Sequence, residues 1–160
     1  MKWIAILLWA GLCPVVMTYL RQRPAHVAWA AFGMGLLPFV TGTLHLYVAP
    51  IAWPQWAGWP KGIEVSALDF LAIAIIGATR SPPSKLRPLT PWLVYLAAVV
   101  IALPHAEVKM AGYFYVWQLL RMILIASAAI RLAAYAGAVD SLFKGIFAGV
   151  CFQAAFAIEQ

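Results

Sequence analysis

Charge is scarce in this sequence, and acidic charge is scarcest. Asp, Glu, Lys and Arg make up 10% of the 160 residues, with 5 acidic side chains against 11 basic ones. Soluble domains carry about 25% charged and about 45–50% apolar residues, whereas 65% of this chain is hydrophobic and its mean hydropathy is +0.89. This balance excludes an ordinary soluble domain and indicates an integral membrane protein.

The sequence also lacks the motifs of soluble-type chemistry: a phosphate loop, a Gly-rich dinucleotide turn, His-Glu-x-x-His and Gly-x-Ser-x-Gly. Cys13 and Cys151 fall in apolar stretches without metal-ligand spacing, so we expect inert hydrophobic side chains. A haem needs two facing histidines at one depth, but His26 and His45 would lie about 28 Å apart on one helix. Only His45 with His105 leaves that geometry open. We therefore assign no metal, no cofactor and no catalytic residue.

What the chain does contain is a series of long apolar stretches joined by short polar connections. A hydrocarbon core of ~30 Å needs about 20 helical residues, with a range of roughly 17–25. Spans must be helices or closed barrels, and these stretches lack the alternating polarity of barrel strands. We therefore predict an all-α, polytopic transmembrane helix bundle of about six spans, forming a single domain over residues 1–160. The stretches are Trp3–Leu20, Val27–Val48, Ile63–Ala78, Leu89–Leu103, Tyr113–Ile130 and about Leu142–Ile158, the third and fourth being slightly short.

The basic residues alternate between connections. Most of them fall in residues 21–26, 79–88 and 131–141, whereas residues 49–62 and 104–112 hold only Lys61 and Lys109. Under the positive-inside rule the richer connections are cytoplasmic, which places the N-terminus outside, on an uncleaved first span. Because the net charge of +6 is spread over connections instead of forming one patch, we expect the lipid bilayer as partner and no nucleic acid.

Two charged residues inside the predicted spans are the candidates for a site. Arg121 lies near mid-span, where a charge costs about 2.5–3.5 kcal/mol on insertion scales. Asp69 lies at about 9 Å depth and Arg121 at about 12 Å, if both helices run outside to inside. A buried Asp69–Arg121 pair is therefore expected. Either the pair is structural, or Arg121 faces an outward cavity and attracts a phosphate, with Gln118 and Tyr115 on its face adding hydrogen bonds.

Three further features carry weaker predictions. Glu64 should act as a cap-like surface residue at the outer end of the third span. The loop with Trp53, Trp56 and Trp59 should anchor at the headgroup level, with a sugar-stacking platform as the alternative. In the last span, Gly145-x-x-x-Gly149 followed by Gln153 should let another helix of the same chain approach closely and form a hydrogen bond, with a dimer interface as the alternative.

The segment Trp59-Pro-Lys-Gly-Ile-Glu-Val-Ser-Ala-Leu-Asp-Phe-Leu-Ala-Ile-Ala74 is similar to the start of an early span in the bacterial O-antigen ligase/polymerase family. The tail Gly145-Ile-Phe-Ala-Gly-Val-Cys-Phe-Gln-Ala-Ala155, followed by Glu159-Gln160, resembles a middle span of those proteins. The family's large outer loop with its essential residues has no counterpart here. The resemblance therefore implies the N-terminal portion of a longer membrane protein, to be completed by further helices of the same chain.

That family transfers or polymerises glycans carried on undecaprenyl diphosphate at the outer face of the bacterial inner membrane, in the synthesis of polysaccharides such as lipopolysaccharide. The resemblance thus implies a multi-pass inner-membrane location and an undecaprenyl-diphosphate-linked glycan as partner, with Arg121, Asp69, Gln118 and Tyr115 as candidate substrate-binding residues. The alternative interpretation is a small membrane transporter or scaffold in which the Asp–Arg pair is structural.

Overall fold

The computed structural model describes residues 2–58, 61–79 and 87–158 and confirms a helical membrane architecture. Within these ranges, four helical segments are long and apolar enough to cross a membrane: Trp3–Gln22, Arg87–His105, Lys109–Leu132 and Ala138–Ile158. The helices are α1 (Lys2–Gln22), α2 (Val27–Val40), α3 (Ala67–Ala78), α4 (Thr90–Ala102), α5 (Lys109–Leu132) and α6 (Ala138–Ile158), with short 3-10 turns η1 (Pro24–His26) and η3 (Leu103–His105).

The other two apolar helices are shorter than predicted. The expected helix over Val27–Val48 ends at Val40, and the one over Ile63–Ala78 begins only at Ala67. A turn follows α2, in which His45 has a positive φ of 53° that no α-helix contains. Of the predicted cytoplasmic connection 79–88, residues 80–86 lie outside the described ranges.

Some of the residues missing from these two helices, Tyr47, Val48 and Ile63–Ser66, belong to a β-hairpin that the sequence analysis did not predict. Strand β1 (Tyr47–Ala52) pairs antiparallel with β2 (Gly62–Ser66), and the register shifts between Val48 and Ile51. Pro50 falls in that irregular stretch, where its missing N–H costs no regular ladder bond. A side chain at Gly62 would collide with the carbonyl oxygen of Ile51, so the two strands need glycine there.

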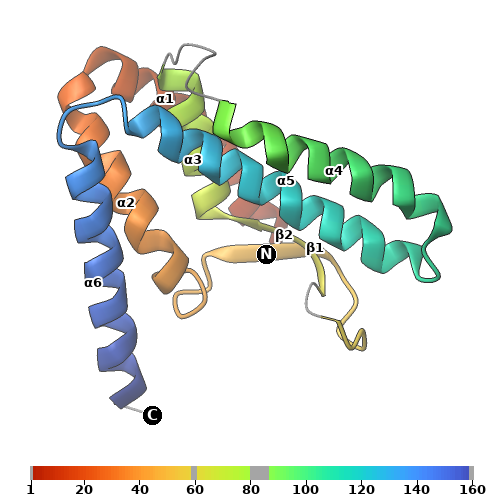
Figure 1. Ribbon diagram of the computed structural model, residues 1–160. Coiled ribbons are helices and arrows are strands. Elements are labelled where there is room, and N and C mark those ends of the chain that lie inside the picture. Colours follow the sequence, from red (N-terminus) through yellow and green to blue (C-terminus); the bar gives the residue numbers. More distant parts are fainter. Residues whose placement is uncertain (1, 59–60, 80–86, 159–160) are drawn as a thin grey trace.

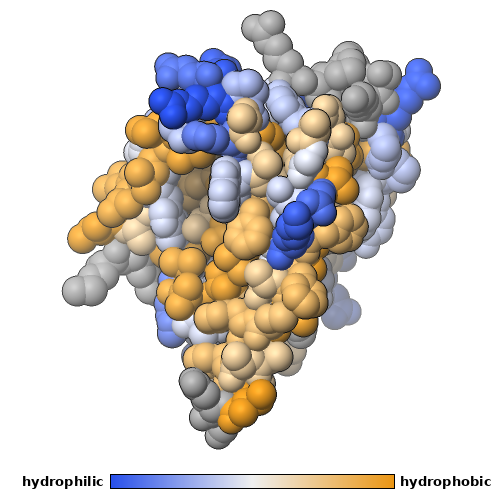
Figure 2. Space-filling model, turned by 90° about the vertical axis from the view of Figure 1, so that its left-hand side faces the viewer, coloured by the Kyte–Doolittle hydropathy of each residue, from blue (hydrophilic) through white to orange (hydrophobic). Residues whose placement is uncertain are grey.

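Two helix pairs diverge from one end of the molecule. Figure 1 shows α2 beside α6 and α4 beside α5, with α1 and α3 behind them and the hairpin in the space between the pairs. The end of α1 and the connection from α5 to α6 lie together at the end opposite the hairpin, as the alternating charge pattern predicts. Figure 2 shows hydrophilic side chains gathered at this end, above a surface that is mostly hydrophobic.

The glycine stripe of α6 packs on α2, which confirms an approach between helices of the same chain. A Cβ at Gly145 would collide with the carbonyl oxygen of Phe32, and one at Gly149 with the ring of Phe39. The Gln153 amide donates to the carbonyl oxygen of Phe39, near the end of α2. This bond satisfies a carbonyl that the helix itself leaves free.

Helix α3 lies at the centre of the packed core. Ala72 and Ile75 are completely buried, and they belong to a cluster with residues of α1, α2 and α5. The helix has 12 residues, which corresponds to a length of about 18 Å against a hydrocarbon thickness of ~30 Å. Its ends therefore need polar partners supplied by the protein.

Candidate functional site

The candidate site begins at the N-terminus of α3. Ser66 is the N-cap residue and Asp69 stands three positions later, the spacing of a capping box. The Ser66 backbone N–H donates to Asp69 Oδ2 at 2.7 Å, and the Ser66 hydroxyl donates to the same oxygen at 2.9 Å. Both residues are buried, Asp69 with 4% of its surface exposed. The carboxylate thus satisfies one backbone N–H and one side-chain hydroxyl at the start of the helix.

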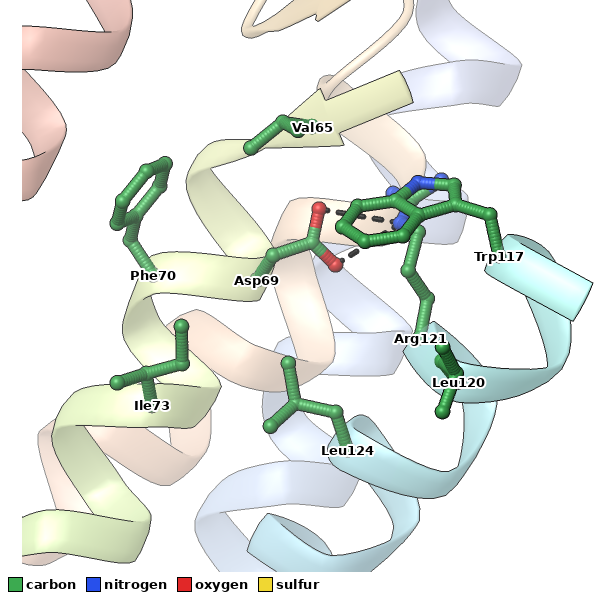
Figure 3. A pocket seen from close by; sticks show the side chains of 8 residues that line it. All are labelled: Val65, Asp69, Phe70, Ile73, Trp117, Leu120, Arg121 and Leu124. Atoms are coloured by element: carbon green, nitrogen blue, oxygen red, sulfur yellow. Dashed lines mark hydrogen bonds and ion pairs between the residues drawn. The ribbon is translucent and has the colours of Figure 1, made fainter. Parts of the chain in front are cut away.

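Arg121 of α5 completes this cluster and confirms the predicted ion pair. Its Nε donates to both carboxylate oxygens of Asp69, at 3.0 and 3.1 Å (Figure 3). Its Nη2 donates to the Ser66 hydroxyl at 3.2 Å, and its Nη1 to Gln118 Oε1 at 3.3 Å. The Arg121 side chain is only 15% exposed. All three guanidinium nitrogens therefore have partners in the protein.

Glu64 does not cap a helix, so that prediction is wrong. It lies on β2, and its carboxylate is 3.8 Å from Arg121 Nη1 while the Glu64 side chain is 38% exposed. Its backbone carbonyl accepts a hydrogen bond of 2.6 Å from the Trp117 indole. The hairpin therefore meets α5 through both the side chain and the backbone of Glu64.

Of the residues proposed to share a face with Arg121, Gln118 contacts it and Tyr115 does not. Tyr115 lies six positions before Arg121, and six steps of about 100° place it roughly 120° away around the helix. It lines a different hollow, between α4 and α5, with Tyr95 and Val99 among its neighbours. Tyr115 is thus not part of the cluster. Sequence reasoning missed Ser66 and Trp117, although Ser66-x-x-Asp69 is a capping pattern that a sequence can reveal.

An apolar groove of about 420 Å³ leads to the ion pair between α3 and α5. In Figure 3, Asp69 and Arg121 face each other across the two helices and the Trp117 ring lies beside them. The groove is lined by Val65, Asp69, Phe70, Ile73, Trp117, Leu120, Arg121 and Leu124. The groove thus combines hydrocarbon walls with one ion pair.

The opposite end of α3 is held by two more arginines. Arg21 of α1 donates to the Gly77 carbonyl from Nε at 3.0 Å and from Nη2 at 2.7 Å. Arg131 of α5 donates from Nη1 to the carbonyls of Ile76, at 3.1 Å, and Thr79, at 2.8 Å. Cations at a helix C-terminus are favoured by the helix dipole and satisfy its free carbonyls.

Helix α5 therefore contacts both ends of α3, and the two run parallel. Arg121 and Arg131 are ten residues apart, about 15 Å along α5, which suits the distance from Asp69 to the last turn of α3. A backbone group left unsatisfied in lipid costs several kcal/mol. The arrangement can therefore keep a helix too short to span the membrane inside its hydrocarbon region.

Electrostatics limits what else Arg121 can bind. Two carboxylates, from Asp69 and Glu64, lie within 4 Å of one guanidinium, so the cluster carries an excess negative charge when all three groups are ionised. A like charge nearby disfavours an added anion. Among the described residues, no group of three or more His, Cys, Asp or Glu side chains could hold a metal ion.

Two of the three tryptophans of the predicted aromatic loop lie within the described residues. Trp53 and Trp56 stack with ring centroids 5.3 Å apart, and Trp59 lies outside the described ranges. The two described tryptophans of this loop therefore contact each other.

The four apolar helices, which are long enough to cross a membrane, and the buried ion pair indicate the class: a membrane-embedded helical protein. Neither a scan against protein-family models nor searches of curated proteins and solved structures finds a match for this chain. The resemblance to O-antigen ligases therefore stays a prediction.

Proposed function

We propose that this chain is a multi-pass membrane scaffold in which the Asp69–Arg121 pair is structural and locks α3 and the hairpin against α5. The observation that carries this proposal is that every guanidinium nitrogen of Arg121 is already bonded within the protein. An arginine that waits for a substrate phosphate needs free donors and no competing carboxylates. Arg121 has few free N–H donors, and two carboxylates, from Asp69 and Glu64, compete for them.

The scaffold proposal includes six membrane crossings. With η1, the second helical segment runs from Pro24 to Val40, about 25 Å long, and α3 crosses with its ends satisfied by the arginines. The basic end then faces the cytoplasm and the hairpin faces outside. Reporters fused after Arg23, Gly62 and Lys85 test this orientation, and a cytoplasmic signal at Gly62 contradicts it.

The test of the structural role compares Arg121→Ala with Arg121→Lys. It measures the amount of folded protein and the binding of undecaprenyl diphosphate separately. The scaffold proposal expects the alanine variant to lose folded protein, because it leaves the Asp69 carboxylate buried without a cation. Lysine keeps the charge but cannot reproduce the planar set of donors, so it should recover only part of the stability. A folded alanine variant with normal stability would contradict the proposal.

The second candidate is part of an O-antigen ligase-type enzyme in a bacterial inner membrane, and the groove is the observation that favours it. Its apolar walls suit a prenyl chain, and Arg121 at its polar end suits a diphosphate. For that role Arg121 would have to leave Asp69. The candidate predicts that undecaprenyl diphosphate changes the fluorescence of Trp117 and that Leu120→Phe, which narrows the groove without adding a tryptophan, weakens this change. No change in fluorescence would exclude the groove as a carrier site.

A further inference from the structure

A second groove lies at the opposite end of the molecule, between α1 and α2. It measures about 430 Å³, and α3 contributes to its wall through Leu71. Its apolar lining includes Val16, Leu20 and Ala30. Trp29 stands at its edge with 74% of its surface exposed. The groove is therefore open to the hydrocarbon that surrounds the protein.

The mouth of this groove is polar and basic. His26 and Tyr19 line it, with ring centroids 5.2 Å apart. The guanidinium carbon of Arg23 lies 5.7 Å from the centre of the Tyr19 ring, a cation–π distance that holds the guanidinium next to a residue lining the groove. Tyr and Trp side chains of this kind sit at the level of lipid headgroups.

The charge of Arg23 is not neutralised within the described parts of the chain. Among the residues described, the ion pairs join Arg121 to Glu64 and Asp69, and Lys144 to Asp140. Arg23 itself is exposed. Arg23 differs in this from Arg121, whose guanidinium lies within 4 Å of the carboxylates of Glu64 and Asp69. Among the described residues, the α1–α2 groove therefore combines an apolar lining with a nearby cation that forms no ion pair.

We propose that the α1–α2 groove binds one anionic phospholipid of the adjacent leaflet, with an acyl chain along Leu20 and Trp29 and the phosphate on Arg23. Charge complementarity selects an anionic over a zwitterionic lipid, since each basic residue near an anionic membrane surface contributes about a fivefold gain in binding. The lipid would fill the space between α1 and α2 at the end where both helices join η1.

The experiment uses the full chain, purified in detergent and equilibrated with equal amounts of phosphatidylglycerol and phosphatidylcholine, with bound lipid counted by native mass spectrometry. Arg23→Gln should lower the retention of phosphatidylglycerol about fivefold. Arg87→Gln is the matched control, because Arg87 is also exposed and basic, whereas Arg23 lies against Tyr19 of the groove. Equal losses from the two variants would mean a general surface charge effect and would overturn the proposal.

The acyl-chain contact is tested by a tryptophan pair. Trp29→Ala should reduce phosphatidylglycerol retention, whereas Trp92→Ala on α4 should not, and both side chains are exposed enough to be removed without disturbing the core. Inorganic phosphate at millimolar concentration should fail to displace the lipid. Displacement by phosphate, or unchanged retention in Trp29→Ala, would show that the groove does not hold a chain.

Discussion

Removal of the Arg121 side chain should destabilise the protein far more than the loss of ordinary hydrogen bonds would. Interhelical hydrogen bonds in membranes average about 0.6 kcal/mol, with measured values up to about 1.7 kcal/mol. Breaking a buried ion pair from one side costs about 3–5 kcal/mol, because the other charge stays buried without compensation. Arg121→Ala leaves the carboxylate of Asp69, only 4% exposed, in that position. We therefore expect a loss of about 3 kcal/mol or more.

Asp69→Asn removes the negative charge that pairs with Arg121 but keeps the side-chain oxygen that caps α3. The Asn side-chain oxygen can still accept from the Ser66 backbone N–H, so the helix start is kept, while the negative charge is lost. Arg121 then retains Glu64 at 3.8 Å as a partial partner, so the loss should be smaller than that of Arg121→Ala. The double variant should lose less than the sum of the two, with a coupling energy of about 1–3 kcal/mol.

The assay is equilibrium unfolding in detergent micelles or bicelles for the wild type, the two single variants and the double variant. Arg121→Lys is the charge-preserving control and should fall between wild type and Arg121→Ala. Two results would refute this reasoning: additive losses in the double variant, or a loss from Arg121→Ala within the range of about 0.6–1.7 kcal/mol that a hydrogen bond alone explains.

Three further predictions concern the remaining contacts. Gly145→Ala should cost about 1–3 kcal/mol in unfolding free energy, because its Cβ would meet the Phe32 backbone. Gly11→Ala is the control: its Cβ meets nothing within 4 Å, so the change should be neutral or slightly stabilising. Equal effects of the two variants would argue against the α2–α6 packing. Gln153→Leu should cost about 1 kcal/mol, measured by thermal unfolding, and a neutral result would mean that its bond to α2 contributes nothing. Arg131→Gln should speed amide hydrogen exchange in the last turn of α3 with little change in α6, and uniform exchange across both helices would contradict its role at that end.

Hydropathy and depth predicted the helices and the ion pair because both follow from the membrane's thickness. Asp69 and Arg121 were paired from residue counts alone, and their contact confirms that α3 and α5 run parallel. The hairpin could not be predicted in this way. Tyr47, Val48 and Val65 lie within the predicted apolar stretches, and hydropathy does not distinguish a short strand from the end of a helix.

The partial failure at the site has a different cause. The prediction that Tyr115 shares a face with Arg121 is wrong, because its angular position around α5 points it elsewhere. The capping role predicted for Glu64 depends on a helix that begins at Ile63, whereas α3 begins four residues later, at Ala67. The pattern Ser66-x-x-Asp69 marks the true start and would have moved Glu64 out of the helix.

The most direct test of the account measures the Asp69–Arg121 contact in lipid bilayers by solid-state NMR, with ¹⁵N-labelled arginine and ¹³C-labelled aspartate. Our account predicts strong dipolar coupling between Arg121 Nε and the Asp69 carboxyl carbon, as an Nε–Oδ1 distance of 3.0 Å requires, and its loss in Asp69→Ala. Absence of this coupling in the folded wild-type protein would contradict the claim that the pair holds α3 against α5.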